Sequence, residues 1–143
     1  MELVQYEPGH LRCLSLQDNQ RMLTPVLADP KYAASLAEAG PAFTGIEAGK
    51  VVGCAGLVHQ WSGRAIAWAL LDRNCAYAML GVHRATQRFL TECGVRRVEA
   101  YVDPNFRAAK KWALMLGFEY EGLMNCFTPD GRPSILFARI RGD

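Results

Sequence analysis

Carboxylates and imidazoles flanked by apolar residues are the groups in this sequence that could take a proton from an attacking nucleophile. A general base must lie within hydrogen-bond reach of that nucleophile and needs a pKa near neutrality. Glu99 lies in the strand-like run VRRVEAYVD, where partial burial would raise the pKa of its carboxyl group. His59 ends another such run, and Glu47 precedes a turn. The structural alternatives are a Glu99 ion pair with Arg96, Arg97 or another cation, a structural His59 and a solvated Glu47.

Cysteine and histidine usage predicts neither metal nor disulfide chemistry. The five cysteines are odd in number and contain no C-x-x-C pair, and the three histidines show no metal-ligand spacing. We therefore expect small, buried cysteines and no metal cofactor. Cys75 could act as a nucleophile at a helix N-terminus, but no histidine partner is identifiable for it.

The element that is easiest to recognise runs from residue 103 to residue 122, DPNFRAAKKWALMLGFEYEG. Asp103 and Pro104 suit the N-cap and first position of a helix, and Gly117 suits a left-handed stop. A short strand and a second glycine follow. Apolar residues recur at helical spacing on one face of this helix, namely Phe106, Ala109, Ala113 and Leu116.

The rest of the chain predicts one domain, residues 1–143, in which strands and helices alternate without a linker. We expect strands over 2–7, 42–47, 51–59, 65–71, 95–103, 118–127 and 134–140, and helices from Pro8, from Pro30 to residue 39, over 79–93 and after Asp103. The run AIAWALL at 65–71 is apolar throughout, which is typical of a strand at the centre of a sheet.

The helix ended by Gly-Phe, the strand and glycine after it, and the full-length order of elements resemble the GNAT superfamily of N-acetyltransferases. The resemblance implies an α/β (α+β) fold with four helices and a mixed, mostly antiparallel sheet of about seven strands. It implies a central parallel crossover between strands 65–71 and 95–103. It also implies an enzyme that transfers an acetyl group from acetyl-CoA to an amine, without a metal. The pantetheine arm of this cosubstrate would lie in a V between the two parallel strands.

By the same resemblance, the cofactor would contact the end of strand 65–71, the loop RNCAYAM and the start of the last helix. The implied residues are Ala69, Leu70, Leu71, Arg73, Asn74, Cys75, Ala76, Tyr77, Ala78, Met79 and Asn105. Two features of the family are missing. The loop has Cys75 and Tyr77 where glycines are usual, so that Arg73 would have to compensate by charge. Ala113, beside Trp112, stands where many of these enzymes have a tyrosine that protonates the departing thiolate.

Both missing features favour a second hypothesis, a GNAT-shaped binding or structural protein without activity. The runs VVGCAGLV, GRAIAWALL and LGFEYEGLM resemble a phage-encoded GNAT-like group that includes an internal virion protein, and imply a partner within a phage virion. A V that is open would favour the enzyme. A V plugged by Trp68, Trp112 or Tyr77 would favour the binding protein.

Net charge and hydropathy argue against nucleic acid and membranes as partners. Sixteen basic and fourteen acidic residues give a net charge of +2, too small to favour nucleic acid, and no apolar run reaches the roughly 18 residues of a membrane span. We expect a cytoplasmic protein, in the host cytoplasm or the virion if it is phage-encoded. Trp61 should be partly exposed, and Trp68 and Trp112 should be in the core. A homodimer could form if strand 134–140 pairs edge to edge with a second copy.

Overall fold

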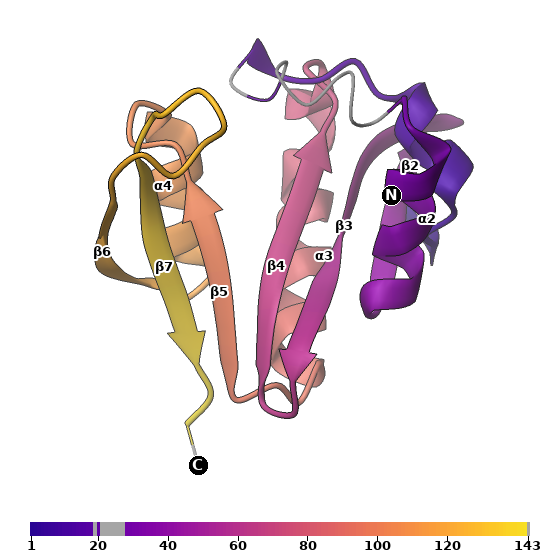
Figure 1. Cartoon of the computed structure of the whole chain (residues 1–143). Coiled ribbons are helices and arrows are strands. Elements are labelled where there is room, and N and C mark those ends of the chain that lie inside the picture. Colours follow the sequence, from indigo (N-terminus) through magenta and orange to yellow (C-terminus); the bar gives the residue numbers. More distant parts are fainter. Residues whose placement is uncertain (19, 21–27, 143) are drawn as a thin grey trace.

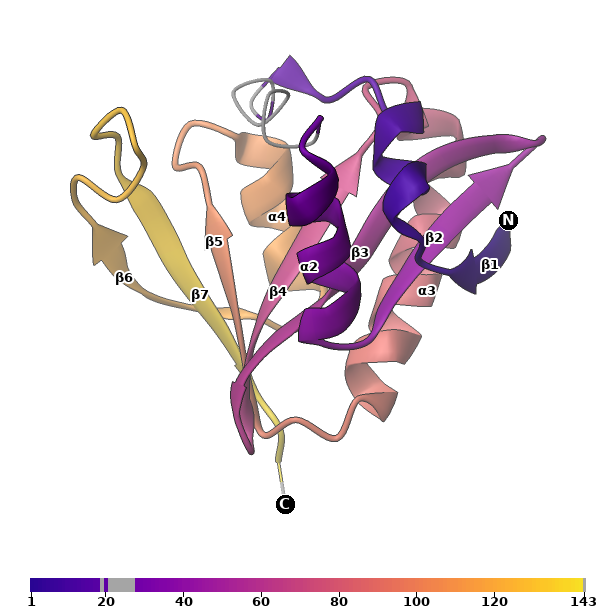
Figure 2. The ribbon, with the colours of Figure 1, turned by 45° about the vertical axis from the view of Figure 1, so that its right-hand side comes forward.

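The chain forms one seven-stranded mixed sheet with helices on both faces, as the computed structural model shows for residues 1–18, 20 and 28–142 (Figure 1). The strand order is β1-β2-β3-β4-β5-β7-β6. Only β4 and β5 pair in parallel, and all other neighbours are antiparallel. Figure 2 shows α2 in front of the sheet, with α3 and α4 behind it. The predicted fold class and the central position of strand 65–71 are confirmed.

The strands are β1 (Glu2–Gln5), β2 (Ala42–Glu47), β3 (Lys50–Trp61), β4 (Arg64–Leu71), β5 (Arg97–Val102), β6 (Glu119–Met124) and β7 (Ser134–Ile140). The helices are η1 (Pro8–Cys13) and η3 (Cys75–Ala78), both 3₁₀, and α2 (Pro30–Ala39), α3 (Met79–Glu92) and α4 (Arg107–Met115). Local sequence signals account for several boundaries. Asp29 caps α2 by accepting a hydrogen bond from Lys31 N at 2.9 Å, and Gly49, at φ +77°, closes the β2–β3 turn.

The start of α4 differs from the prediction. Asp103 and Pro104 do not begin the helix, because the Asp103 carboxylate instead accepts a hydrogen bond from Asn105 N (2.9 Å) and closes a turn. The helix begins at Arg107, after Phe106 as N-cap. Its end is as predicted, since Gly117 has φ +91°, a conformation that glycine adopts without strain.

Strand β7 lies between β5 and β6 and pairs with both. The expectation that strand 134–140 offers a free edge to a second copy is therefore wrong, because both of its edges are used within the chain. The free edges of the sheet belong to β1 and β6.

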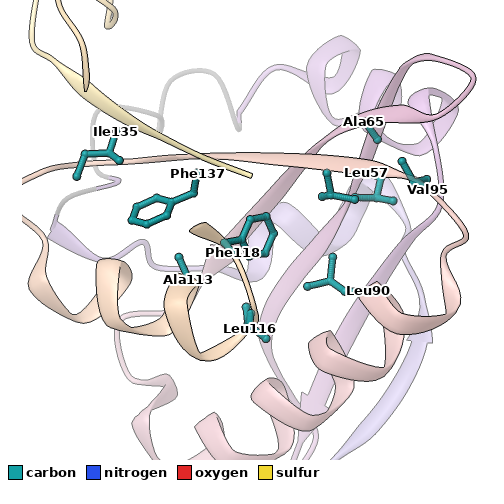
Figure 3. Close-up of a cluster of buried hydrophobic side chains, with 10 residues drawn as sticks. Leu57, Ala65, Leu90, Val95, Ala113, Leu116, Phe118, Ile135 and Phe137 are labelled. Atoms are coloured by element: carbon teal, nitrogen blue, oxygen red, sulfur yellow. The ribbon is translucent and has the colours of Figure 1, made fainter. Parts of the chain in front are cut away.

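The largest hydrophobic cluster fills the space between the sheet and the two rear helices (Figure 3). Leu57 of β3, Ala65 of β4 and Val98 of β5 supply its fully buried floor. Leu90 of α3 and Ala113 of α4 pack onto this floor, which fixes both helices against the strands. A second cluster lies on the opposite face, where α2 and η1 pack against β3 and β4.

Arg139 of β7 joins both rear helices to the sheet. Its Nε donates to Leu116 O and its Nη1 donates to Leu90 O, each at 3.1 Å. A cation is favourable at helix C-terminal carbonyls because it offsets the negative end of the helix dipole.

We expect Arg139→Met to lower the free energy of unfolding by about 1–2 kcal/mol, since two charge-assisted hydrogen bonds are lost and the alkyl packing is kept. Urea unfolding followed by circular dichroism measures this change. Arg88→Met, at an exposed position of α3, is the matched control and should change stability little. Equal losses in both variants would contradict the role given to Arg139.

Candidate functional site

Strands β4 and β5 pair over only three residue pairs and then separate. The pairs are Arg64 with Arg97, Ala65 with Val98 and Ile66 with Glu99. Beyond Ile66 the strands splay into a V, which is visible in Figure 1. Arg97 N donates to Gly63 O at 2.9 Å, so the odd-numbered residues of β4 turn their backbone groups toward β5. Ala69 follows in this phase and presents its backbone to the opening.

A cavity of about 520 Å³ occupies this opening and reaches both faces of the sheet. Ala67 of β4 packs with the cluster of the rear helices, whereas Trp68 packs with the cluster of α2. Both residues line the cavity, together with Tyr32 from α2, Tyr101 from β5 and Trp112 from α4. Trp68 and Trp112 are partly buried wall residues that leave the V open, and Tyr77 is 62% exposed outside it.

A second, more polar hollow of about 570 Å³ lies where the β4–α3 and β5–α4 loops face each other at the open end of the V. It is lined by Gln17, Asp18, Arg73, Asn74, Asp103, Asn105 and Phe106. Arg73 is exposed and lines both spaces. An anionic ligand passing from the V to the surface would therefore meet this guanidinium.

The loop at 73–79 uses several of its own amides internally. Arg73 N donates to Ser15 O (2.7 Å), Asn74 N to Asp72 Oδ2 (3.1 Å) and Cys75 N to Asp72 O (3.0 Å). Residues 75–78 then form a 3₁₀ turn, and α3 begins at Met79. The first three amides of this loop are therefore unavailable to a phosphate unless these bonds break.

The predicted cofactor residues divide into three groups. Seven line the cavity: Ala69, Leu70, Leu71, Arg73, Cys75, Ala76 and Met79. Asn74 and Asn105 line the polar hollow. Tyr77 and Ala78 line neither space, because Tyr77 points to the surface and Ala78 is buried against β3 and α3.

The expectation that burial raises the pKa of Glu99 is wrong, and the ion-pair alternative is confirmed. Glu99 is 4% exposed, and its carboxylate accepts hydrogen bonds from Arg64 (2.5 and 3.0 Å) and from Arg97 (2.8 Å). These guanidiniums outweigh desolvation and lower its pKa from 4.5 to about 2. Such a weak base accepts a proton from an amine poorly. Glu99 instead holds β4 to β5 at the closed end of the V.

The other candidate bases do not reach the cavity. Glu47 forms an ion pair with the N-terminal ammonium of Met1 at 3.0 Å, so it is not merely a solvated turn residue. His59 is exposed and pairs opposite Ala65, toward the closed end of the V. Trp61 is 64% exposed, as predicted, and lies under the guanidinium of Arg64, 4.6 Å from its ring centroid.

The cysteine prediction is confirmed only in part. Cys54 and Cys75 are buried, and burial raises the pKa of both thiols, which keeps them protonated. Cys13 and Cys126 are exposed, contrary to expectation. Among the described residues, no cluster of three or more potential ligands is placed to hold a metal ion, and no helix is long and apolar enough to span a membrane.

Sequence reasoning missed two tyrosines that line the cavity, Tyr32 and Tyr101. Burial raises the pKa of both phenols, and for Tyr101 the nearby negative charge of Glu99, which accepts a hydrogen bond from its hydroxyl at 3.4 Å, adds to the effect. The amphipathic pattern of α2 could have indicated Tyr32. No signal along the chain places Tyr101, because strand alternation does not reveal where two strands separate.

No protein-family model matches the sequence, and no curated protein matches it by sequence. Solved structures match over nearly the whole chain. A ribosomal-protein-alanine N-acetyltransferase from Brucella melitensis has a TM-score of 0.77 at 15% identity, covering 99% of this chain and 100% of that one. This chain has the GNAT fold. The ribosomal-protein-alanine N-acetyltransferase from Escherichia coli has a TM-score of 0.73 at 20% identity, with coverages of 99% and 96%. An aminoglycoside 6'-acetyltransferase has a TM-score of 0.72 at 15% identity, covering 98% of this chain and 97% of that one.

The Glu99 ion pairs should make the stability of this GNAT-fold domain depend on pH. A carboxyl pKa that is lower in the folded than in the unfolded protein stabilises the fold above about pH 4.5, and this contribution is lost as pH falls toward 2. We expect acidification from pH 5 to pH 2 to cost about 2–3 kcal/mol through Glu99 alone.

Urea unfolding across this pH range tests the expectation. Glu99→Gln should be less stable at pH 7 and should show a shallower pH dependence than the unmodified protein. Glu121→Gln removes the more exposed partner of Arg97 and should change the slope less. Equal slopes in the protein and in Glu99→Gln would contradict the assignment.

Proposed function

We propose that the protein is an acyl-coenzyme A-dependent N-acyltransferase that transfers an acetyl group to an amine by direct attack. The observation that carries this proposal is the open cavity at the splay of β4 and β5, which connects the two faces of the sheet. A thioester arm can enter such a passage from one face and an amine from the other. Two reactants held in one passage react as an effectively unimolecular pair.

The residues around the passage fit the parts of this cosubstrate. The Ala69 backbone offers a strand edge to the amides of the pantetheine arm, and alanines along the V leave room for it. Helices α3 and α4, behind the sheet, carry five cations against the single carboxylate of Glu92, namely Arg84, Arg88, Arg107, Lys110 and Lys111. This excess of positive charge, with Arg73 at the polar hollow, suits the phosphates of the ligand.

In the proposed reaction the amine nitrogen attacks the thioester carbonyl, the C–N bond forms, the C–S bond breaks, coenzyme A leaves as the thiolate, and water takes the proton that the amine loses. Helix α4 has Ala113 at the position of the family's tyrosine, and the neighbouring Trp112 donates its Nε1 proton to His83 Nδ1 at 3.1 Å. Tyr32 lines the cavity and its phenol keeps its proton at neutral pH, so it can donate a hydrogen bond to the departing thiolate, whereas the Tyr101 hydroxyl already donates to Glu99.

The second candidate is a GNAT-fold binding protein without catalysis. The internal bonds of the Arg73, Asn74 and Cys75 amides favour it, because a phosphate-binding loop normally offers such groups to its ligand. A partner in a phage virion would belong to this candidate and rests on sequence resemblance alone.

Saturating acetyl-CoA should raise the melting temperature of the purified protein by several degrees. A ligand at 100 times its Kd adds about 2.7 kcal/mol to the folded state, which is a shift of this size for a domain of 143 residues. A free adenine nucleotide is the control for nonspecific phosphate binding. A shift with acetyl-CoA alone would justify a screen of amines by release of free thiol. Its absence would favour the binding protein.

Arg73→Ala should weaken acetyl-CoA binding by roughly tenfold or more, because a charge-assisted hydrogen bond to phosphate is lost. Titration calorimetry measures the dissociation constants. Arg12→Ala removes an exposed arginine of η1 that lines neither the cavity nor the polar hollow, and it should leave affinity unchanged. Equal affinities of the Arg73→Ala and unmodified proteins would show that the phosphates bind elsewhere.

A further inference from the structure

The free edge of β4 inside the V is capped by a side chain from a distant part of the sequence. Gln20 Nε2 donates a hydrogen bond to Ala69 O at 2.9 Å, although the two residues are 49 positions apart. Ala69 is three residues beyond Ile66, the last residue of β4 that pairs with β5. Its carbonyl therefore has the side-chain amide of Gln20 where a paired strand would supply a backbone N–H.

Among the residues that the structure describes, only one end of the Gln20 carboxamide has a hydrogen-bond partner. Its Oε1 is buried and has no hydrogen-bond partner among the described residues. A buried carbonyl without a partner is unfavourable, because it has given up its water and gained nothing in return. The hydrogen bond to Ala69 O thus holds the Gln20 side chain in a position where burial of its Oε1 is unfavourable.

Gln20 also lines the cavity, beside Trp68 and Ala69 of β4. A carboxamide bonded to a strand edge reproduces the interaction that an amide of a ligand would make there. The pantetheine arm of the proposed cosubstrate contains secondary amides, whose N–H groups can donate to a backbone carbonyl as Gln20 does. Gln20 Nε2 already holds the position in front of Ala69 O from which a ligand amide in the cavity would donate to this carbonyl.

We propose that the Gln20 carboxamide occupies, in the free protein, the position on Ala69 that an amide of the thioester arm takes on binding. This inference rests on the proposed function and adds a residue that the cosubstrate must displace. Gln20 thus competes with the cosubstrate for Ala69 O, and it lowers the affinity for the cosubstrate by the free energy of one hydrogen bond. Its release leaves Ala69 O to the ligand.

Gln20→Ala should therefore bind coenzyme A more tightly than the unmodified protein, by about threefold to tenfold, which is the usual net worth of one such bond. Titration calorimetry with coenzyme A gives the dissociation constants directly and needs no amine acceptor. Gln60→Ala is the matched control. It removes a glutamine that also donates to a backbone carbonyl, Val58 O at 3.3 Å, but lies outside the cavity.

Tighter binding by Gln20→Ala alone supports the inference. Equal or weaker binding by Gln20→Ala, when the unmodified protein binds coenzyme A, overturns it while leaving the proposed function intact. Failure of all three proteins to bind coenzyme A rejects the proposed function and this inference together. Circular dichroism spectra of the three free proteins, which should agree closely, exclude a change in folding as the cause, and Gln20→Ala should melt slightly lower because it lacks the bond to Ala69 O.

Discussion

The functional architecture depends on one buried ion pair network at the closed end of the V. Glu99 of β5 lies between the guanidiniums of Arg64 and Arg97, one from each of the two parallel strands. Because the carboxylate is ionised and fully engaged, it holds β4 and β5 together at the rung where their pairing ends. Beyond the pair of Ile66 with Glu99 the strands separate, and this separation creates the cavity. A buried carboxylate whose sequence context suggests a catalytic base thus has a structural role that shapes the site.

Small side chains leave the gap between the separated strands unfilled. Ala67 and Ala69 on β4, Ala100 on β5 and Ala113 on α4 all line the cavity, and none can reach across it. The larger aromatic residues lie at its walls. Trp68 packs edge-to-face on Tyr6, with ring centroids 5.4 Å apart, and Trp112 is tied to His83 on α3. The opening is therefore a property of residue size at a few positions, combined with the anchoring of the bulky neighbours away from its centre.

The loop between β4 and α3 has few free backbone amides for an anionic ligand. A glycine-rich loop would present backbone N–H groups that have no internal partner. In this loop three backbone N–H groups donate to Ser15 and Asp72, and the Arg73 side chain lines the polar hollow. Charge attracts phosphate over a longer range but fixes its orientation less well than a set of converging amides. An internal hydrogen bond is also present at Ala69, where Gln20 donates to a backbone carbonyl that is left unpaired because β4 and β5 separate. In both places the free protein has closed part of its own site with internal hydrogen bonds.

The sequence by itself determined the elements and their order, because these depend on local rules. Apolar periodicity, the Asp29-Pro30 start of α2 and the positive-φ glycines at Gly94 and Gly117 act within a few residues. It also located part of the cavity wall, since the end of β4 and the following loop were predicted to line it. The role of Glu99, the start of α4 at Arg107 and the presence of Gln20 and Tyr101 at the cavity were decided only by tertiary structure. Each of these features depends on a partner that is distant in the sequence or on the point where two strands separate. A local sequence pattern contains no information about either.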